Sequence, residues 1–82
     1  MRGTVNEGGE NLREWLRELR GSKTNKEFGE SIGLSEQYYW MVENGYRQKR
    51  MSVDLLTKIA EVTKKPIKKL VEAENEYHRT HP

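Results

Sequence analysis

The 82-residue sequence predicts an all-α fold built from five short helices. Hydrophobic residues recur at intervals of three and four, the spacing of one helix face, and no stretch alternates hydrophobic and polar residues as a strand would. Residues that favour helix N-termini precede several of these stretches. A chain of this length has room for one domain. We place that domain at residues 10–76, between a glycine-rich, polar segment at 1–9 that we expect to be disordered and a frayed tail at 77–82.

The first predicted helix covers about residues 10–20 and ends before Gly21, a residue that suits a helix C-terminus. Its inward face consists of four residues spaced as i, i+3, i+4 and i+7: Leu12, Trp15, Leu16 and Leu19. Arginines and acids alternate over the rest of this helix, and we interpret them as surface ion pairs.

Two shorter helices are predicted next, at about residues 25–32 and 36–43, with Thr24 and Ser35 as their N-caps. Gly33 ends the first of them and Asn44-Gly45 ends the second. The inward residues are Phe28 and Ile32 in the first and Tyr39 and Val42 in the second.

A polar, basic loop at residues 46–51 leads to the last two predicted helices. Ser52 caps the fourth helix, and Met51 and Leu56 are placed to form a hydrophobic staple across that cap. Pro66 suits the first turn of the fifth helix. The residues expected to face inward are Leu56, Ile59, Ala60 and Thr63 in the fourth helix and Ile67, Leu70 and Val71 in the fifth.

Residues 24–44 have the features that two helices need in order to cross steeply through a short turn. Gly29 is the small residue where the third helix crosses the second, Gly33 tolerates a positive φ in the turn, and Leu34 follows as an apolar plug. Tyr39 and Val42 then return to the core three residues apart. The sequence therefore predicts a helix-turn-helix at about residues 24–44.

These features resemble the Cro/repressor-type (XRE) helix-turn-helix family, which includes the lambdoid phage repressors. The resemblance covers roughly residues 12–71 and extends to Glu43-Asn44-Gly45 and to Leu56, Ile59 and Ala60 further along the chain. It implies a five-helix, lambda-repressor-like DNA-binding domain whose third helix enters the major groove of double-stranded DNA.

By this resemblance, exposed residues at the start of the third helix meet base edges, namely Glu36, Gln37, Tyr38 and Met41. Gln37 is the strongest candidate because its amide can pair with adenine in a bidentate manner, which is worth about 1–3 kcal/mol of discrimination. Glu36 could accept a hydrogen bond from cytosine or could instead interact with the positive end of the helix dipole. Met41 would contact a thymine methyl group.

The net charge of +2 is too small for DNA binding by bulk attraction, so the distribution of charge matters. Residues 20–26 and 46–50 contain cations and no acids. The candidates for contact with the DNA backbone lie at helix N-termini and among these cations: Thr24, Asn25, Lys26, Ser35, Asn44, Tyr46, Arg47, Lys49 and Arg50. The loop at 46–51 is longer than the common family form, which leaves the direction of Lys49 and Arg50 open.

Trp40 departs from the family pattern, in which this position is small or polar. Its indole either packs along the loop after the third helix or is offered to DNA or to a protein partner. Two hypotheses for the function follow. One is a sequence-specific transcriptional regulator, expected to be a repressor of phage, plasmid or mobile-element type that occludes its operator. The alternative is a protein-interaction module on the same fold, such as an antitoxin or a phage-encoded inhibitor, that uses the aromatic face of the third helix.

The regulator hypothesis also predicts a homodimer. A single recognition helix reads only a few base pairs, so two copies on a pseudopalindromic site are the economical route to specificity. By resemblance, and because nothing later in the sequence covers them, Leu70 and Val71 are the expected dimer surface.

Other classes of site and activity find no support in the sequence. Cysteine is absent, which excludes disulfides and thiolate metal sites. His78 and His81 lie in the predicted tail without a third ligand, so we expect no metal, and we expect no cofactor and no small-molecule substrate. No nucleotide-binding or catalytic motif is present, so an enzyme is not expected. Without a membrane-spanning run or a secretory signal, the sequence predicts a cytoplasmic protein with no membrane partner.

Overall fold

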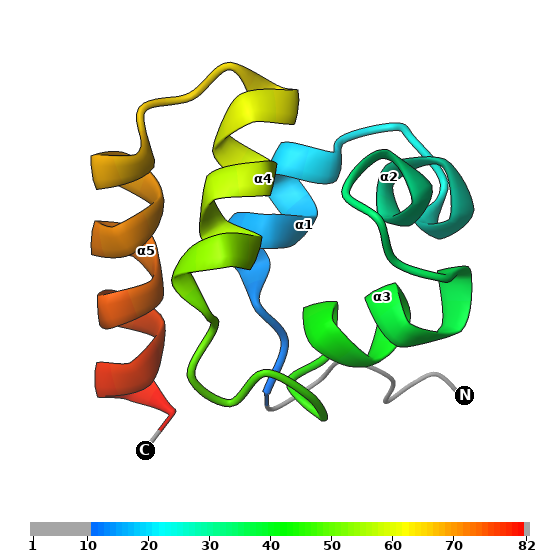
Figure 1. Cartoon of the computed structure of the whole chain (residues 1–82). Coiled ribbons are helices and arrows are strands. Elements are labelled where there is room, and N and C mark those ends of the chain that lie inside the picture. Colours follow the sequence, from blue (N-terminus) through cyan, green and yellow to red (C-terminus); the bar gives the residue numbers. More distant parts are fainter. Residues whose placement is uncertain (1–10, 82) are drawn as a thin grey trace.

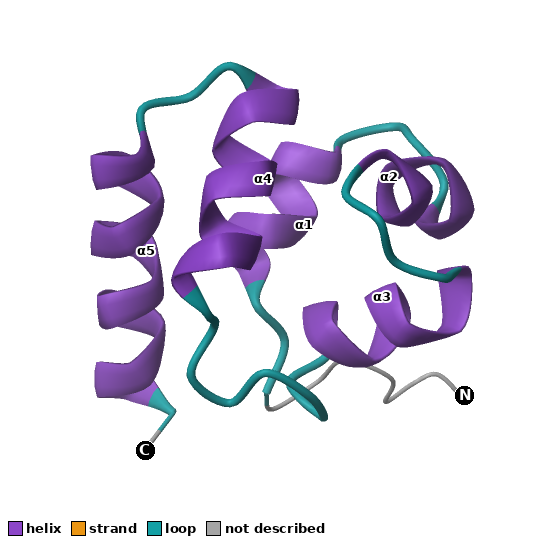
Figure 2. Ribbon diagram, viewed as in Figure 1, coloured by secondary structure: helices purple, strands orange, loops and turns teal. Residues whose placement is uncertain are grey.

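The computed structural model describes residues 11–81, so the disorder expected for residues 1–9 lies outside the described residues. Within that range it contains five helices and no strand, which confirms the predicted all-α class (Figures 1 and 2). The helices are α1 (Glu14–Arg20), α2 (Asn25–Ser31), α3 (Glu36–Glu43), α4 (Val53–Thr63) and α5 (Ile67–Thr80).

The three predicted N-caps are confirmed. The hydroxyl of Thr24 accepts from the N–H of Glu27, and the Glu27 carboxylate accepts from the N–H of Thr24, which completes a capping box. The hydroxyls of Ser35 and Ser52 accept the equivalent bonds at the starts of α3 and α4. Local side-chain chemistry therefore sets where these helices begin.

The sequence predicted that the first helix begins near residue 10, but α1 begins at Glu14. Arg13 occupies its N-cap position without a side-chain cap, and the Arg13 N–H donates to the Glu43 carbonyl at the end of α3, 2.8 Å away. The backbone before Glu14 is thus held by a tertiary hydrogen bond.

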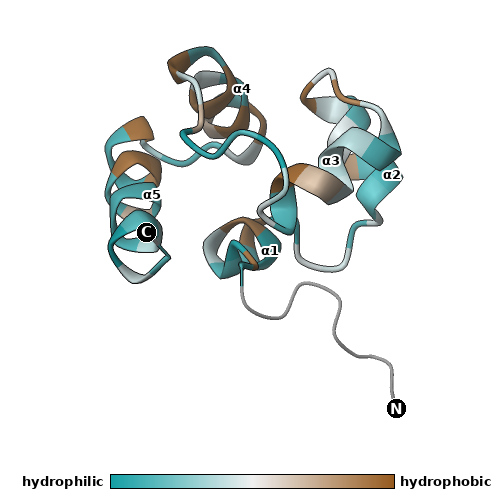
Figure 3. Ribbon diagram, turned by 90° about the horizontal axis from the view of Figure 1, so that it is seen from below, coloured by the Kyte–Doolittle hydropathy of each residue, from teal (hydrophilic) through white to brown (hydrophobic). Residues whose placement is uncertain are grey.

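The hydrophobic core collects buried residues from all five helices and from the loop before α4: Leu16, Phe28, Ile32, Tyr39, Val42, Met51, Leu55, Leu56, Ile59, Ala60 and Leu70. Met51 and Leu56 are both members, as the predicted staple requires. Leu55 is buried although it was not predicted, whereas Thr63 is only half-buried. Figure 3 shows the hydrophobic residues of α5 in its first turns and hydrophilic residues towards its C-terminal end.

Helix α5 corrects two predictions. It continues to Thr80, so the tail at 77–82 is not frayed from residue 77. Leu70 is 3% exposed and lies in the core, so it cannot form a dimer surface, because the chain's own helices cover it. Val71, the other predicted dimer residue, is 39% exposed. No helix of the described residues is long and apolar enough to cross a membrane.

Candidate nucleic-acid interface

The crossing of α2 and α3 has the geometry that the glycines predicted. A Cβ at Gly29 would lie 2.9 Å from the Cβ of Tyr39 and 3.3 Å from the carbonyl oxygen of Leu34, so the two helices approach too closely for a side chain there. Gly33 adopts a φ of +81°, and the Leu34 N–H donates back to the Gly29 carbonyl at 2.8 Å. The ring of Phe28 meets that of Tyr39 edge-on at 5.4 Å.

The buried carboxylate of Glu43 ties α3 to α1. The Tyr39 hydroxyl donates to Oε1 of Glu43 at 2.6 Å, and the Arg20 guanidinium of α1 donates to both Glu43 oxygens, with Nε 2.9 Å from Oε1. Burial, together with the hydrogen bond to Glu43, raises the pKa of Tyr39. The hydrogen bond to Glu43 also raises the pKa of Arg20. Arg20 is therefore paired with Glu43, so its charge is not free for DNA contact as the other cations of residues 20–26 are.

The predicted base-reading residues occupy two environments on α3. Glu36 and Gln37 are exposed, and with Asn25 and Trp40 they line a surface hollow of about 510 Å³. Tyr38 is half-buried, and its hydroxyl accepts from Nε2 of Gln48 at 3.0 Å; Met41 is half-buried as well. The freely exposed side chains are thus the first two of the helix.

Trp40 packs along the loop after α3, the first of the two arrangements expected for it. Its indole stacks on the ring of Tyr46, with centroids 5.6 Å apart and planes at 16°, and it stays 36% exposed. Tyr46, a predicted backbone contact, is thereby held beside α3. Asn44 is a correction: it is 6% exposed and its amide donates to the Trp40 carbonyl at 2.9 Å, so it ends α3 and does not offer its amide to a phosphate.

The other predicted backbone contacts lie at the surface. The hydroxyls of Thr24 and Ser35 accept capping bonds and still have their protons to donate. Asn25 is half-buried, and its Oδ1 is covered without a hydrogen-bond partner among the described residues. The four cations of this set are exposed: Lys26, Arg47, Lys49 and Arg50. Lys49 and Arg50 lie beside the end of α5, where they line a second hollow.

The sequence reasoning missed a buried arginine at the start of α1. Arg13 is 0% exposed, although the alternating charges of this region predicted surface ion pairs. Its guanidinium pairs with the Glu74 carboxylate of α5, with Nε 3.0 Å from Oε1 and Nη2 2.9 Å from Oε2. It also donates to the main-chain carbonyls of Val42, Arg47 and Gln48. One side chain thus joins α1, the end of α3, the following loop and α5.

Glu74 completes this Arg13–Glu74 cluster. Its carboxylate also accepts from Nε1 of Trp15 at 3.1 Å and lies 3.0 Å from Nε2 of His78. The ring of Tyr77 lies 4.8 Å from the Arg13 guanidinium carbon. A charge can be buried when it is paired and hydrogen-bonded, and these partners meet that need. The sequence does carry a clue, because Glu74 follows Leu70 by four residues and so shares the inward face of α5.

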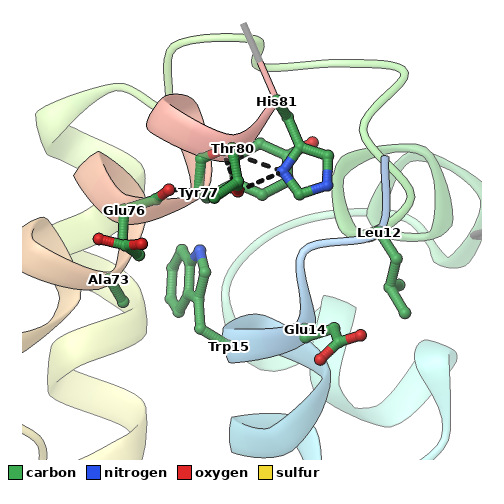
Figure 4. A pocket seen from close by; sticks show the side chains of 8 residues that line it. All are labelled: Leu12, Glu14, Trp15, Ala73, Glu76, Tyr77, Thr80 and His81. Carbon is green, nitrogen blue, oxygen red and sulfur yellow. Dashed lines mark hydrogen bonds between the residues drawn. The ribbon is translucent and has the colours of Figure 1, made fainter. Parts of the chain in front are cut away.

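Between the start of α1 and the end of α5 lies a groove of about 420 Å³ (Figure 4). Trp15 stands against it, and the ring of His81 stacks on that of Tyr77 at 4.5 Å. Nδ1 of His81 lies 3.0 Å from the Tyr77 carbonyl oxygen. These contacts, with the Tyr77 hydroxyl donating to the Asn11 carbonyl at 2.6 Å, explain why α5 stays helical past residue 77. Among residues 11–81, no group of three acids or histidines lies close enough to hold a metal ion.

The comparisons with known proteins bear on this interface. A family model described as helix-turn-helix matches residues 14–70, well over half of the chain. The match includes the α2–α3 crossing and the loop after α3, and it ends before Glu74, Tyr77 and His78 of α5. No curated protein and no solved structure matches the chain significantly.

Proposed function

The chain belongs to the Cro/C1-type (XRE) helix-turn-helix family of DNA-binding regulators, and on that premise we propose that it is a sequence-specific transcriptional regulator of double-stranded DNA. The observation that carries this proposal is the asymmetry of α3. Tyr39 and Val42 are fully buried and Glu43 is held by Arg20, whereas Glu36 and Gln37 are exposed at the start of the same helix. A helix clamped on one side and open at its N-terminal end suits insertion into a major groove.

Gln37 is the base reader in this proposal, because an amide both donates to and accepts from a base edge. Lys26 and Arg47 supply contacts to the flanking phosphates from the start of α2 and from the loop after α3. The Trp40–Tyr46 stack holds the side of α3 that faces this loop. Base reading and backbone contact thus come from adjoining segments.

We further propose that the regulator acts as a homodimer and represses by occupying an operator that overlaps a promoter. One copy of α3 reads too few base pairs for specific binding, and a second copy doubles the site. Three exposed apolar residues of α4 and α5 supply the dimer surface in place of the buried Leu70: Val62, Ile67 and Val71.

Selection of duplexes from a random library, followed by affinity measurements over a range of salt, tests the proposal. We expect an enriched sequence and an affinity that falls linearly on logarithmic axes as salt rises. Gln37→Ala should cost about 1–3 kcal/mol on the selected site and relax the preference at one base pair. Lys26→Ala should weaken binding to all sequences and lower the salt slope by about one.

Lys68→Ala is the matched control, because Lys68 is also an exposed lysine but lies on α5, and we expect it to leave DNA binding unchanged. The absence of any enriched sequence would contradict the regulator. A protein partner that is lost with Trp40→Ala, while DNA binding is absent throughout, would favour the interaction module.

A further inference from the structure

A second surface hollow lies where the loop after α3 meets the end of α5. Its volume is about 560 Å³, and four basic side chains line it: Lys49, Arg50, His78 and His81. Tyr77, Gly45 and Asn11 complete the wall, and no carboxylate belongs to it. Lys49 and Arg50 lie within the family match, whereas the histidines and Tyr77 come from the part of α5 beyond it.

The two long cations of this hollow have no acidic partner. Lys49 and Arg50 are exposed, and neither makes an ion pair within residues 11–81. An ammonium beside a guanidinium is a pair that binds phosphate, the first as a point charge and the second as a fork of N–H donors. The electrostatics of the hollow therefore favour an oxyanion.

The carboxylate of Glu74, which lies beside His78, already has several partners. It holds Arg13 and Trp15, and it contacts Nε2 of His78 at 3.0 Å. Nδ1 of His81 lies 3.0 Å from the Tyr77 carbonyl oxygen, so this ring is also held beside the hollow.

The walls of the hollow are held in place before any ligand binds. The carbonyls of Arg47 and Gln48 accept from the buried Arg13, which fixes the loop just before Lys49. Gly45 has a φ of +84°, and a Cβ there would overlap the Asn11 carbonyl, so the loop and the residues before α1 are in close contact. Burial raises the pKa of Tyr77, whose phenol stays neutral and bonded to Asn11. A preformed site spends less binding energy on ordering its own side chains.

We propose that this hollow binds a phosphate group through Lys49 and Arg50, with His78 and His81 on its wall. The phosphate comes either from the DNA backbone or from a free phosphate or phosphate ester. Figure 1 shows α3, the loop after it and the C-terminal end of α5 along the same lower side of the molecule, which suits the DNA source. Binding of a DNA phosphate at this site rests on the proposed function, whereas binding of a free phosphate or phosphate ester does not.

Titration of the full chain with inorganic phosphate, followed by NMR of the His78 and His81 rings, tests the site directly. Sodium chloride at matched ionic strength is the reference. We expect saturable shifts of both rings, and about a tenfold or greater loss of affinity in the Lys49→Ala/Arg50→Ala double variant. The Lys68→Ala/Lys69→Ala double variant removes two exposed charges from the opposite end of α5 and should bind phosphate as the wild type does. The proposal would be overturned if the shifts do not saturate with phosphate. It would also be overturned if both double variants lose the same amount of phosphate affinity.

Sulfate is the second probe, because it is also a tetrahedral oxyanion. It should bind with saturation and should lose affinity in the Lys49→Ala/Arg50→Ala double variant, as phosphate does. A sulfate affinity that is unchanged in that variant would overturn the proposal.

DNA binding by the same variants separates the two sources. If the phosphate belongs to DNA, Lys49→Ala/Arg50→Ala should lower the salt slope of DNA affinity by about two, and inorganic phosphate should compete with DNA. If DNA affinity is unchanged while phosphate binding is lost, the ligand is a free phosphate. A chain that binds phosphate but no DNA would contradict the proposed function and leave this site standing.

Discussion

Neutralising the buried carboxylate of Glu74 is the sharpest test of how this fold is held together. Glu74→Gln keeps the shape of the side chain and removes its charge. The Arg13 guanidinium, which is fully buried, then has no counter-charge, although three main-chain carbonyls still accept from it. Breaking a buried ion pair from one side costs about 3–5 kcal/mol, because the remaining charge is left uncompensated.

That cost is large for a protein of 82 residues, whose free energy of unfolding is expected at about 4–12 kcal/mol. Urea unfolding followed by circular dichroism measures the difference. The matched control is Glu76→Gln on the same helix, where the pair with Arg79 is exposed over 58% and 76% of the two side chains. We expect the control to lose less than about 1 kcal/mol. A Glu74→Gln variant as stable as the control would refute the reasoning, whereas a chain already unfolded in water would exceed the expected loss.

The double variant Arg13→Met/Glu74→Leu tests which hydrogen-bond partners of Arg13 contribute to the free energy of unfolding. Replacing a buried ion pair by apolar residues is often close to neutral. Here the double variant should remain destabilised, because the carbonyls of Val42, Arg47 and Gln48 each lose a donor. The bond to Val42 is buried, and leaving its carbonyl unsatisfied costs about 1–3 kcal/mol. Recovery of wild-type stability would mean that the loop carbonyls find water instead.

Three further predictions concern the helix-turn-helix and the proposed dimer. Gly29→Ala should lower the free energy of unfolding by about 1–3 kcal/mol in urea titrations, because its Cβ would lie 2.9 Å from that of Tyr39; an unchanged midpoint would mean that α2 and α3 can separate without cost. The raised pKa of Tyr39 means that the folded state prefers the neutral phenol. Its contribution to the free energy of unfolding is therefore present below about pH 10 and is lost as pH rises above that value. In unfolding curves measured from pH 8 to 11, Tyr39→Phe should lose less stability with rising pH than the wild type does. Val71→Glu should convert the proposed dimer to a monomer in sedimentation experiments and leave the fold intact, and a dimer that persists would place the interface elsewhere.

The sequence alone predicted those features that depend on neighbours along the chain. Thr24, Ser35 and Ser52 were expected as caps, and each accepts its bond in the structure, because a cap needs only a side chain and an N–H three residues later. Gly33 likewise predicted the turn, because a positive φ is a local requirement, and Gly29 marked the point where α3 crosses α2. The exposed position of Gln37 was implied by the family resemblance, and the structure agrees with it.

Only the tertiary structure decided which polar side chains are buried. Arg13 and Glu74 are 61 positions apart, and no spacing in the sequence pairs them. Their pairing joins α1 to α5, and Arg13 also holds the loop before Lys49, which lies beside the histidines at the end of α5. Leu70 and Asn44 were misjudged for a related reason, because burial depends on which helices pack over a residue. Periodicity shows that one face of a helix turns inward; the partner that meets a charge on that face is set by how the whole chain folds.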